Sequence, residues 1–451
     1  MDERDMFLEE ILAEFGSEEK QSKPKPQKKR PMEESAASEK KNPDALSDTV
    51  VFKPVRTRNA PERQPKKAEK PVKEEKKTAP KKAEKKVQPP KQEKVEAPGK
   101  KSFGMRLLGF LGKFSLILLE TVLLLLITAY GVLFILAKGP SPTARDLFVR
   151  SVRETSAIGF IAEIYFTEDE IAQIENAEEI EEYQETDTSL ITIAKPEDTE
   201  GADGPVPDAW GLVDEDGDGI ILESVTGEGY VGYMLVIPDP SQVILGSVPT
   251  SYGARGFSVE EMVKNFDGLA GINAGGFYDP DGTGNGSIPD TLVVYEGKTY
   301  YAGYGVGNGF VGLDSNHILH VGKLTKEEIE ARDIQYGVCF GPVLISNGEV
   351  VLAENNVGGL NPRTAIGQRS DGAILMLVID GRQVTSIGAT YRDLVDIFLE
   401  YGAVNACNLD GGSSSMMWYG DSYVNNCASV IGIRPVPTAF VVLKKGVEDN
   451  A

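Results

Sequence analysis

Histidine is scarce in this chain, and its scarcity removes several classes of enzyme. The 451 residues include only two histidines, His317 and His320. Both fall in the stretch NHILHVG, which has strand character, so residues three apart face opposite sides and we expect both to be structural. A Ser–His–Asp triad, an HExxH zinc site and a multi-histidine metal centre are therefore not expected. Any hydrolysis must use carboxylates, asparagine, arginine, hydroxyl groups or an oxygen-ligated metal.

Cysteine is almost as rare, because the chain has only Cys339, Cys407 and Cys427. Three cysteines are too few for a disulfide scaffold, and none forms the CxxC pair that would indicate a zinc site. Isolated buried thiols are the plainer interpretation. A bridge between Cys407 and Cys427 is the alternative, if this part of the chain lies outside the cell.

Charge is distributed unevenly along the chain. Residues 21–106 carry 26 lysines and arginines against 12 acidic residues, whereas residues 107–451 carry 19 against 49. The two parts therefore meet different surroundings or partners. The acidic part repels nucleic acid, so we expect no nucleic-acid partner. For the basic part, a lipid surface is the closest candidate partner.

The N-terminal quarter of the chain has little capacity to fold alone. Residues 1–16 place Phe7, Leu8, Ile11, Leu12 and Phe15 at helical spacing, which predicts an amphipathic helix. Such a helix is typical of a docking peptide for a cytoplasmic partner. The alternative is a helix that forms only weakly in isolation. Residues 17–105 consist mainly of Lys, Glu, Pro, Ala and Gln, which predicts a disordered basic linker.

A long apolar run follows the basic linker. Residues 114–137 read FSLILLETVLLLLITAYGVLFILA, and 24 residues at ~1.5 Å each give about 36 Å of helix. We therefore expect a single transmembrane helix within 106–138. Because basic residues crowd its N-terminal flank, the N-terminus is expected in the cytoplasm and the C-terminal domain outside the cell membrane.

The remainder divides into a stalk and one folded domain. Residues 139–207 predict a helical stalk followed by an acidic linker, with helix across 143–182. Residues 208–446 predict an α+β fold, a strand-rich mixed sheet with a few flanking helices. Strands are expected at 229–237, 291–295, 309–313 and 374–379, and helices at 258–265, 325–331 and 390–401.

Four segments of this domain combine strand ends, glycines and polar side chains: GINAGGFYDPDG, NPRTAIG, LMLVIDGR and NACNLDGGSSSMM. Glycines after a strand allow backbone N–H groups to converge on an anion. Arg363 offers a planar fork for two phosphate oxygens, and Asp380 or Asp410 at a strand end could transfer a proton. Taken singly, each segment is also typical of an ordinary turn, because Asp-Gly pairs favour turns. The expectation is that the four segments meet in one site.

The order NAGGF, NPRTAIG, DGR, a helix beginning at GAT, NLDGGSSS, Asn425 and Arg434 resembles the phosphodiester glycosidase family, over roughly residues 229–443. That family includes the enzyme that uncovers mannose 6-phosphate on lysosomal proteins, and bacterial members often labelled exopolysaccharide biosynthesis proteins. The site residues that the resemblance implies are Asn273, Gly275, Gly276, Arg363, Thr364, Asp380, Arg382, Asn408, Asp410, Gly411, Gly412, Ser413 and Ser414. One departure is that the family loop commonly reads GGGSS, and Ser413 replaces its third glycine.

The resemblance implies a membrane-anchored hydrolase that cuts a sugar-1-phosphodiester of a cell-envelope glycan or exopolysaccharide between the anomeric carbon and the phosphate. Within the set, we expect Arg363 to hold the phosphate, Asp410 or Asp380 to move the proton, and Asn273 and Asn408 to orient sugar hydroxyls. The alternatives are a non-catalytic carbohydrate-binding or scaffold protein of the envelope, and a glycosyl-phosphate transferase that uses the same site.

Two acidic turns make Ca²⁺ a possible cofactor. VDEDGDGIIL presents Asp214, Asp216 and Asp218 like the opening half of a calcium loop, but Val225 stands where the closing bidentate glutamate belongs. YDPDGTGNG offers a second set, Asp279, Asp281 and Asn285. For both, a tight polar turn is the competing interpretation, and it is favoured for the first.

Overall fold

The computed structural model describes residues 103–155, 158–175, 184–193, 207–279, 284–300, 309–353, 357–429 and 432–445. The helix expected at 1–16 and nearly all of the linker expected at 17–105 lie outside these residues. The described residues from Leu118 onward belong to one compact unit.

The apolar run forms one long helix, α2 (Phe103–Lys138). Its segment Phe110–Lys138 has a mean hydropathy of 2.4 and is long and apolar enough to cross a membrane. Its apolar side chains are largely exposed, as expected for a helix that lies in lipid and not in a protein core.

The predicted stalk is a cluster of three short helices, α3 (Pro142–Arg153), α4 (Phe160–Tyr165) and α5 (Glu168–Glu175). Ser141 caps α3 by accepting a hydrogen bond from the Ala144 N–H, and Pro142 occupies the first turn, where it is best tolerated. The three helices share a small apolar core with the end of α2, which includes Ala137, Phe148, Val149, Val152, Ala162, Phe166, Ile171 and Ile174.

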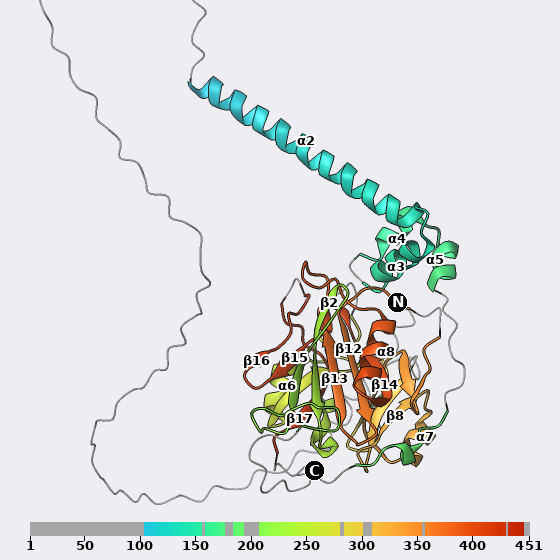
Figure 1. The fold of residues 1–451 in the computed structure, drawn as a ribbon. Coiled ribbons are helices and arrows are strands. Elements are labelled where there is room, and N and C mark those ends of the chain that lie inside the picture. Colours follow the sequence, from blue (N-terminus) through green and yellow to red (C-terminus); the bar gives the residue numbers. More distant parts are fainter. Residues whose placement is uncertain are drawn as a thin grey trace, which may run out of the picture. The chain divides into compact units, whose positions relative to one another are not determined.

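The folded domain contains three sheets (Figure 1). The seven-stranded sheet runs in the order β1-β2-β13-β12-β14-β10-β11. Its strands are β1 (Ile221–Gly227), β2 (Tyr230–Ile237), β10 (Val343–Ser346), β11 (Glu349–Val350), β12 (Arg363–Arg369), β13 (Ile374–Ile379) and β14 (Ala403–Leu409). Its central strands β12 and β13 are buried at every position, which explains the continuous apolar run of β13.

The other two sheets have five strands each, ordered β16-β15-β4-β17-β3 and β6-β5-β9-β7-β8. The first contains β3 (Val243–Ser247), β4 (Gly268–Asn273), β15 (Met417–Tyr419), β16 (Ser422–Tyr423) and β17 (Thr438–Leu443). The second contains β5 (Val293–Tyr295), β6 (Lys298–Tyr300), β7 (Phe310–Asp314), β8 (Leu319–Gly322) and β9 (Ile334–Cys339). Short 3₁₀ turns are η1 (Thr188–Leu190), η2 (Pro240–Gln242), η3 (Pro249–Ser251) and η5 (Gly412–Ser414).

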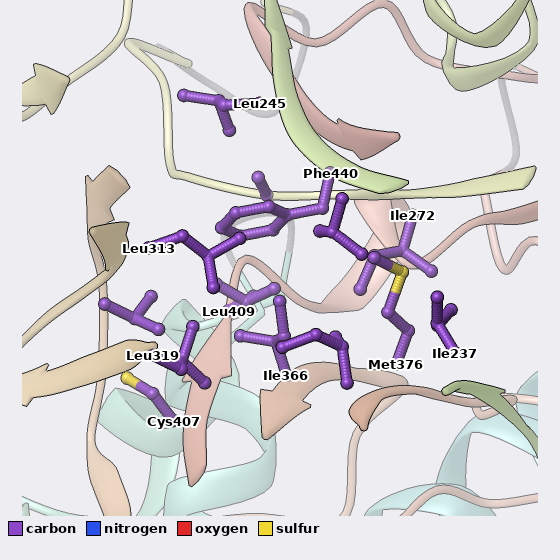
Figure 2. Close-up of a cluster of buried hydrophobic side chains, with 14 of the residues drawn as sticks. Ile237, Leu245, Ile272, Leu313, Leu319, Ile366, Met376, Cys407, Leu409 and Phe440 are labelled. Atoms are coloured by element: carbon purple, nitrogen blue, oxygen red, sulfur yellow. The ribbon is translucent and has the colours of Figure 1, made fainter. Parts of the chain in front are cut away.

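The main core lies between one face of the seven-stranded sheet and the two smaller sheets. Figure 2 shows Ile366, Met376 and Leu409 of the large sheet opposite Ile272 and Phe440 of the β4–β17 sheet. The opposite face of the large sheet is covered by α8 (Tyr391–Glu400), whose Leu394, Ile397 and Phe398 belong to a second apolar cluster. Gly367 of β12 leaves room for Phe398, because a Cβ there would lie 2.8 Å from the phenyl ring.

Helices and strands of the domain begin close to the predicted residues. Ser258, Thr325 and Thr390 each form a capping box, at α6 (Val259–Asn265), α7 (Lys326–Ala331) and α8. Cys339 and Cys407 are free and buried, as the plainer interpretation expects, whereas Cys427 is free and only half-buried.

Two details of the prediction are wrong. The expected mixed sheet is instead three sheets in which every pairing among the described strands is antiparallel. Hairpins join β1 to β2, β12 to β13 and β7 to β8, whereas α8 crosses over β12 to connect β13 with β14. His317 is not in a strand, because it lies in the turn before β8 with φ of +61°. His320 is buried in β8, with Nε2 3.1 Å from Asp314 Oδ2.

Candidate active site

The four glycine-flanked segments meet at one end of the large sheet. The side-chain amide of Asn273 donates to the Asp410 carbonyl at 2.6 Å, and the Thr364 hydroxyl donates to Asn273 Oδ1 at 2.9 Å. The Gly412 N–H donates to the Pro362 carbonyl at 2.9 Å. These bonds join the NAGGF, NPRTAIG and NLDGGSSS segments directly.

Strand register explains this convergence. β12 begins at Arg363, where it pairs with Ile379 of β13, and its next residue pairs with Leu409 of β14. Because both neighbours are antiparallel to β12, the last residues of β13 and β14 lie beside the first residues of β12. Asp380 and Asp410 therefore leave the sheet at the same edge at which Arg363 enters it.

The fourth segment reaches the glycine loop through Arg382. A Cβ built on Gly412 would lie 3.3 Å from Arg382 Nη2, and Gly412 has φ of +62°, which favours glycine. Arg382 is exposed and also has a left-handed backbone, with φ of +57°. Its Nη2 donates to Asn361 Oδ1 at 2.9 Å and to the Thr155 hydroxyl at 2.7 Å. An exposed guanidinium beside a glycine turn is suited to holding a phosphate group.

Asp410 has the electrostatic character of a proton-transfer group. The pKa of its carboxyl is raised to about 7, chiefly by burial and also by the nearby Asp290 and Asp279 carboxylates, whereas the Ser414 hydroxyl and Arg434 act in the opposite direction. The residue still keeps partial access to solvent. A carboxyl that titrates near neutral pH is suited to general acid–base catalysis.

A second charged group lies beside Asp410. Buried Arg434 donates from Nη2 to Asp279 Oδ2 at 2.6 Å and from Nη1 to the Ser413 hydroxyl at 2.9 Å. A Cβ at Gly276 would lie 2.7 Å from Asp290 Oδ2, so the glycine lets this carboxylate approach the NAGGF turn. Gly276 thus lies next to Asp290, and Ser413 lies next to Arg434. Both charged groups influence the pKa of Asp410.

Arg363 lies behind this surface and is only 5% exposed. Its Nε donates to the Ala389 carbonyl at 3.1 Å, and its Nη2 donates to the Gly359 carbonyl at 2.6 Å and to Glu154 Oε2 at 2.7 Å. The guanidinium also lies 4.2 Å from the centroid of the Tyr391 ring. Its predicted contact with phosphate stays a prediction, and in this structure the arginine pairs with Glu154.

Asp380 organises a neighbouring loop. Its Oδ1 accepts hydrogen bonds from the Asn425 amide at 3.1 Å and from the Asn426 N–H at 2.9 Å. Burial raises the pKa of the Asp380 carboxyl, and these two donors oppose the rise. Because Asn425 also donates to the Ser415 carbonyl, Asp380 holds the 425–426 loop against the glycine loop.

Three other predicted residues have mainly structural contacts. The Gly275 N–H donates to the Thr438 hydroxyl at 3.1 Å, and the Asn408 amide donates to the Gly341 carbonyl at 2.7 Å. Asn408 Oδ1 is buried, on the face of β14 opposite Leu409, and accepts no hydrogen bond from the described residues. Gly411 packs on the Pro362 carbonyl, which a Cβ would approach to 2.9 Å.

The sequence prediction omitted several residues from the site. Asn425 and Arg434 were visible in the family order but were not included, and Asp279 was considered only as a calcium ligand. Its carboxylate instead pairs with Arg434, and Asp281 lies outside the described residues. Asp290 and Glu154 carried no motif that could have identified them.

The first acidic turn does form a cluster, because carboxylate oxygens of Asp214, Asp216 and Asp218 lie within 4.8 Å of one another. Asp214 accepts the N–H groups of Gly217 and Gly219, and the Tyr419 hydroxyl donates to Asp218 at 2.6 Å. These bonds close the turn against β15.

Fold and site together bring a near-neutral carboxyl, neighbouring carboxylates and a guanidinium to one glycine turn. Residues 267–443 match the family model for phosphodiester glycosidase, so the family resemblance is confirmed over this segment. The identifying motifs NAGGF, RTAIG, DGR and NLDGGSSS all fall inside it.

The chain is also similar to named proteins. A protein derived from the SPbeta prophage of Bacillus subtilis is 30% identical over 41% of this chain and 29% of its own length. The Bos taurus N-acetylglucosamine-1-phosphodiester alpha-N-acetylglucosaminidase is 25% identical over 41% of this chain and 38% of its own length. The chain thus spans well under half the length of these relatives.

Among solved structures, the auto-inhibited catalytic domain of the zebrafish enzyme of that name matches with 19% identity. The match covers 50% of this chain and 82% of the zebrafish chain, with a TM-score of 0.42.

Proposed function

We propose that the protein is a membrane-anchored extracellular phosphodiester glycosidase that hydrolyses a sugar-1-phosphodiester of a cell-envelope glycan or exopolysaccharide. The observation that carries this proposal is that Asp410, inside the family-matched segment, has a pKa raised to about 7, chiefly by burial. Arg382, beside the Gly412 turn, supplies the positive charge that a phosphodiester requires.

The roles follow from the chemistry of the bond. Water attacks the anomeric carbon, the bond from that carbon to the phosphate oxygen breaks, and the sugar leaves with a new hydroxyl. A phosphate monoester is a good leaving group and needs little protonation, so the harder task is to activate the water. Ionised Asp410 accepts the proton of that water, and Arg382 stabilises the departing phosphate.

The other predicted residues have supporting roles in this proposal. Asn273 fixes the main chain of Asp410 through its 2.6 Å hydrogen bond, and its link to Thr364 ties that contact to β12. Arg434 fixes Ser413 and faces the acidic neighbours of Asp410. Because the domain is acidic overall, these local arginines are the features that attract an anionic glycan.

The anchored context is proposed from the apolar helix and from charge. Helix α2 has the length and hydropathy of a membrane span, and the basic residues before it favour a cytoplasmic N-terminus. The N-terminal helix would then face a cytoplasmic partner. Attachment to the membrane raises the local concentration of the domain near an envelope polymer.

The test is hydrolysis by the full chain in detergent micelles, with a panel of sugar-1-phosphodiesters and product analysis. We expect release of free sugar and phosphate monoester, and loss of this release in Asp410→Asn and Arg382→Ala. Exchange of exposed Arg255, which pairs with Glu261, for Gln is the matched control and should leave the rate unchanged. Glycan binding without turnover on any diester would instead favour a scaffold protein.

A further inference from the structure

The end of the membrane-proximal helix α3 contacts the segment that leads into β12. The Glu154 carboxylate accepts three hydrogen bonds there. Its Oε1 accepts from the Gly359 N–H at 2.9 Å, and its Oε2 accepts from the Asn361 amide at 2.9 Å and from Arg363 Nη2 at 2.7 Å. Three donors from one short segment therefore converge on a single carboxylate, which is an extensive set for a side chain outside the domain.

The neighbours of Glu154 continue this contact. The Ser151 hydroxyl accepts from the Leu360 N–H at 2.9 Å, and the Thr155 hydroxyl accepts from Arg382 Nη2 at 2.7 Å. A Cβ at Gly359 would lie 2.5 Å from the backbone N and Cα of Ser151, so only glycine allows this approach. Backbone packing this close places the end of α3 directly against the segment that leads into β12.

From Glu154, two short chains of contacts lead to the proposed phosphate position. Asn361, whose amide Glu154 holds, accepts from Arg382 through its Oδ1. Arg363 forms an ion pair with Glu154 and directly follows Pro362 in the chain. The Pro362 carbonyl in turn accepts the hydrogen bond from the Gly412 N–H. Glu154 therefore bears on Arg382, which is proposed to contact the phosphate, and on the glycine turn beside it.

Charge gives Glu154 a second effect. Arg363, Arg382 and Glu154 together carry a net charge of plus one at neutral pH. A phosphodiester carries one negative charge, whereas a phosphate monoester carries close to two. Without the Glu154 carboxylate the group would carry plus two, which favours the doubly charged product over the singly charged substrate.

We propose that Glu154 is a positioning and specificity residue of this active site, which orients Asn361 and Arg363 and sets the local charge to suit a diester. The proposal rests on the proposed function and extends it to a residue outside the family-matched segment. The membrane-proximal helix is then part of the catalytic unit, with Thr155 orienting Arg382 from the same turn.

The experiment compares the full chain with Glu154→Gln and Glu154→Asp in detergent micelles. It measures kcat and KM for a sugar-1-phosphodiester and the inhibition constant of inorganic phosphate. Glu154→Gln should lower kcat/KM about tenfold and tighten phosphate inhibition about tenfold, because one charge is removed near the anion. Glu154→Asp keeps the charge, so its phosphate inhibition should stay close to that of the parent chain.

The matched control is Glu163→Gln on α4, where the carboxylate is 55% exposed and pairs only with Arg153. It should leave all three constants within twofold, and circular dichroism should show every variant folded. Faster diester turnover in Glu154→Gln would mean that Glu154 blocks the site, and unchanged phosphate affinity would remove the charge argument. Either result overturns the proposal.

Failure of the proposed function is distinguishable from these outcomes. If the parent chain hydrolyses no diester, the glycosidase assignment fails, and phosphate binding measured by calorimetry still tests Glu154. Tighter phosphate binding in Glu154→Gln than in the parent chain would then support the charge argument alone. Equal phosphate binding would refute it.

Discussion

Replacing Asp410 by asparagine tests the proposed proton transfer most directly. Asparagine has the same shape but cannot accept a proton from water, and the hydrogen bond from Asn273 to the residue 410 carbonyl is kept. General acid–base catalysis typically contributes about 100-fold to 10,000-fold in rate. We therefore expect Asp410→Asn to lose at least about 100-fold in kcat, with a smaller change in KM.

The pH profile of the parent chain follows from the same group. With a pKa of about 7, Asp410 is ionised above neutrality and protonated below it. If ionised Asp410 is the base, kcat/KM rises with pH to a plateau above about pH 7.5. At pH 5, about one hundredth of the plateau rate should remain, because each pH unit below the pKa lowers the ionised fraction tenfold.

The free energy of unfolding should fall as the pH rises, whereas the activity should rise. The pKa of Asp410 in the folded state lies above the ordinary value of 3.8. Its contribution to stability is therefore fully present below pH 3.8 and is lost as the pH rises through about 7. A difference of about three pKa values corresponds to ~4 kcal/mol, and partial exposure of the side chain reduces this to ~2 kcal/mol. Asp410→Asn should therefore be more stable than the parent above pH 7 and nearly equal to it at pH 4.

The assay pairs initial rates with urea unfolding, both from pH 4 to 9, for the parent chain and Asp410→Asn. Activity that falls on raising the pH through 7 would make Asp410 an acid and not a base. A variant that keeps the parent rate and the parent stability at pH 8 would refute both the proposed role and the burial argument behind it.

Three further changes have definite expected outcomes. Arg434→Met removes a positive charge that lowers the pKa of Asp410, so the midpoint of the activity profile should move to higher pH in the same rate assay. Gly412→Ala forces a Cβ to 3.3 Å from Arg382 at a φ of +62°, so we expect a higher KM and a loss of ~1 kcal/mol in stability, measured by kinetics and urea unfolding. Calcium should bind the turn at Asp216 no tighter than about 1 mM in calorimetry, because a bidentate glutamate is lacking; a micromolar site abolished by Asp216→Asn would contradict this.

The positions of the strand ends were predictable because they depend on local pattern. The apolar run before Asp380 and the short strand before Asp410 both end at an Asp-Gly pair. Antiparallel pairing with β12 then brings the two strand ends together. The capping box at Thr390 likewise fixed the start of α8. These features require only a few neighbouring residues to be recognised.

The partners of the charged groups were not predictable from the sequence. Arg363 appeared to be a free phosphate ligand, because its partner Glu154 lies 209 residues earlier in a segment that resembles a simple stalk. Asp290 lies in a turn without a motif, and only the packing of its carboxylate on Gly276 brings it close to Asp410. Contacts of this kind depend on tertiary packing, which local propensity does not specify.

The 12 residues of α3 also limit which glycans can be reached in the anchored arrangement proposed above. A helix of that length rises about 18 Å, and α3 begins four residues after α2 ends at Lys138. Because Thr155 contacts Arg382, the cleavage position stays within a few nanometres of the lipid headgroups. Phosphodiesters at the root of an anchored glycan would be cut, whereas those at its distal tip would escape.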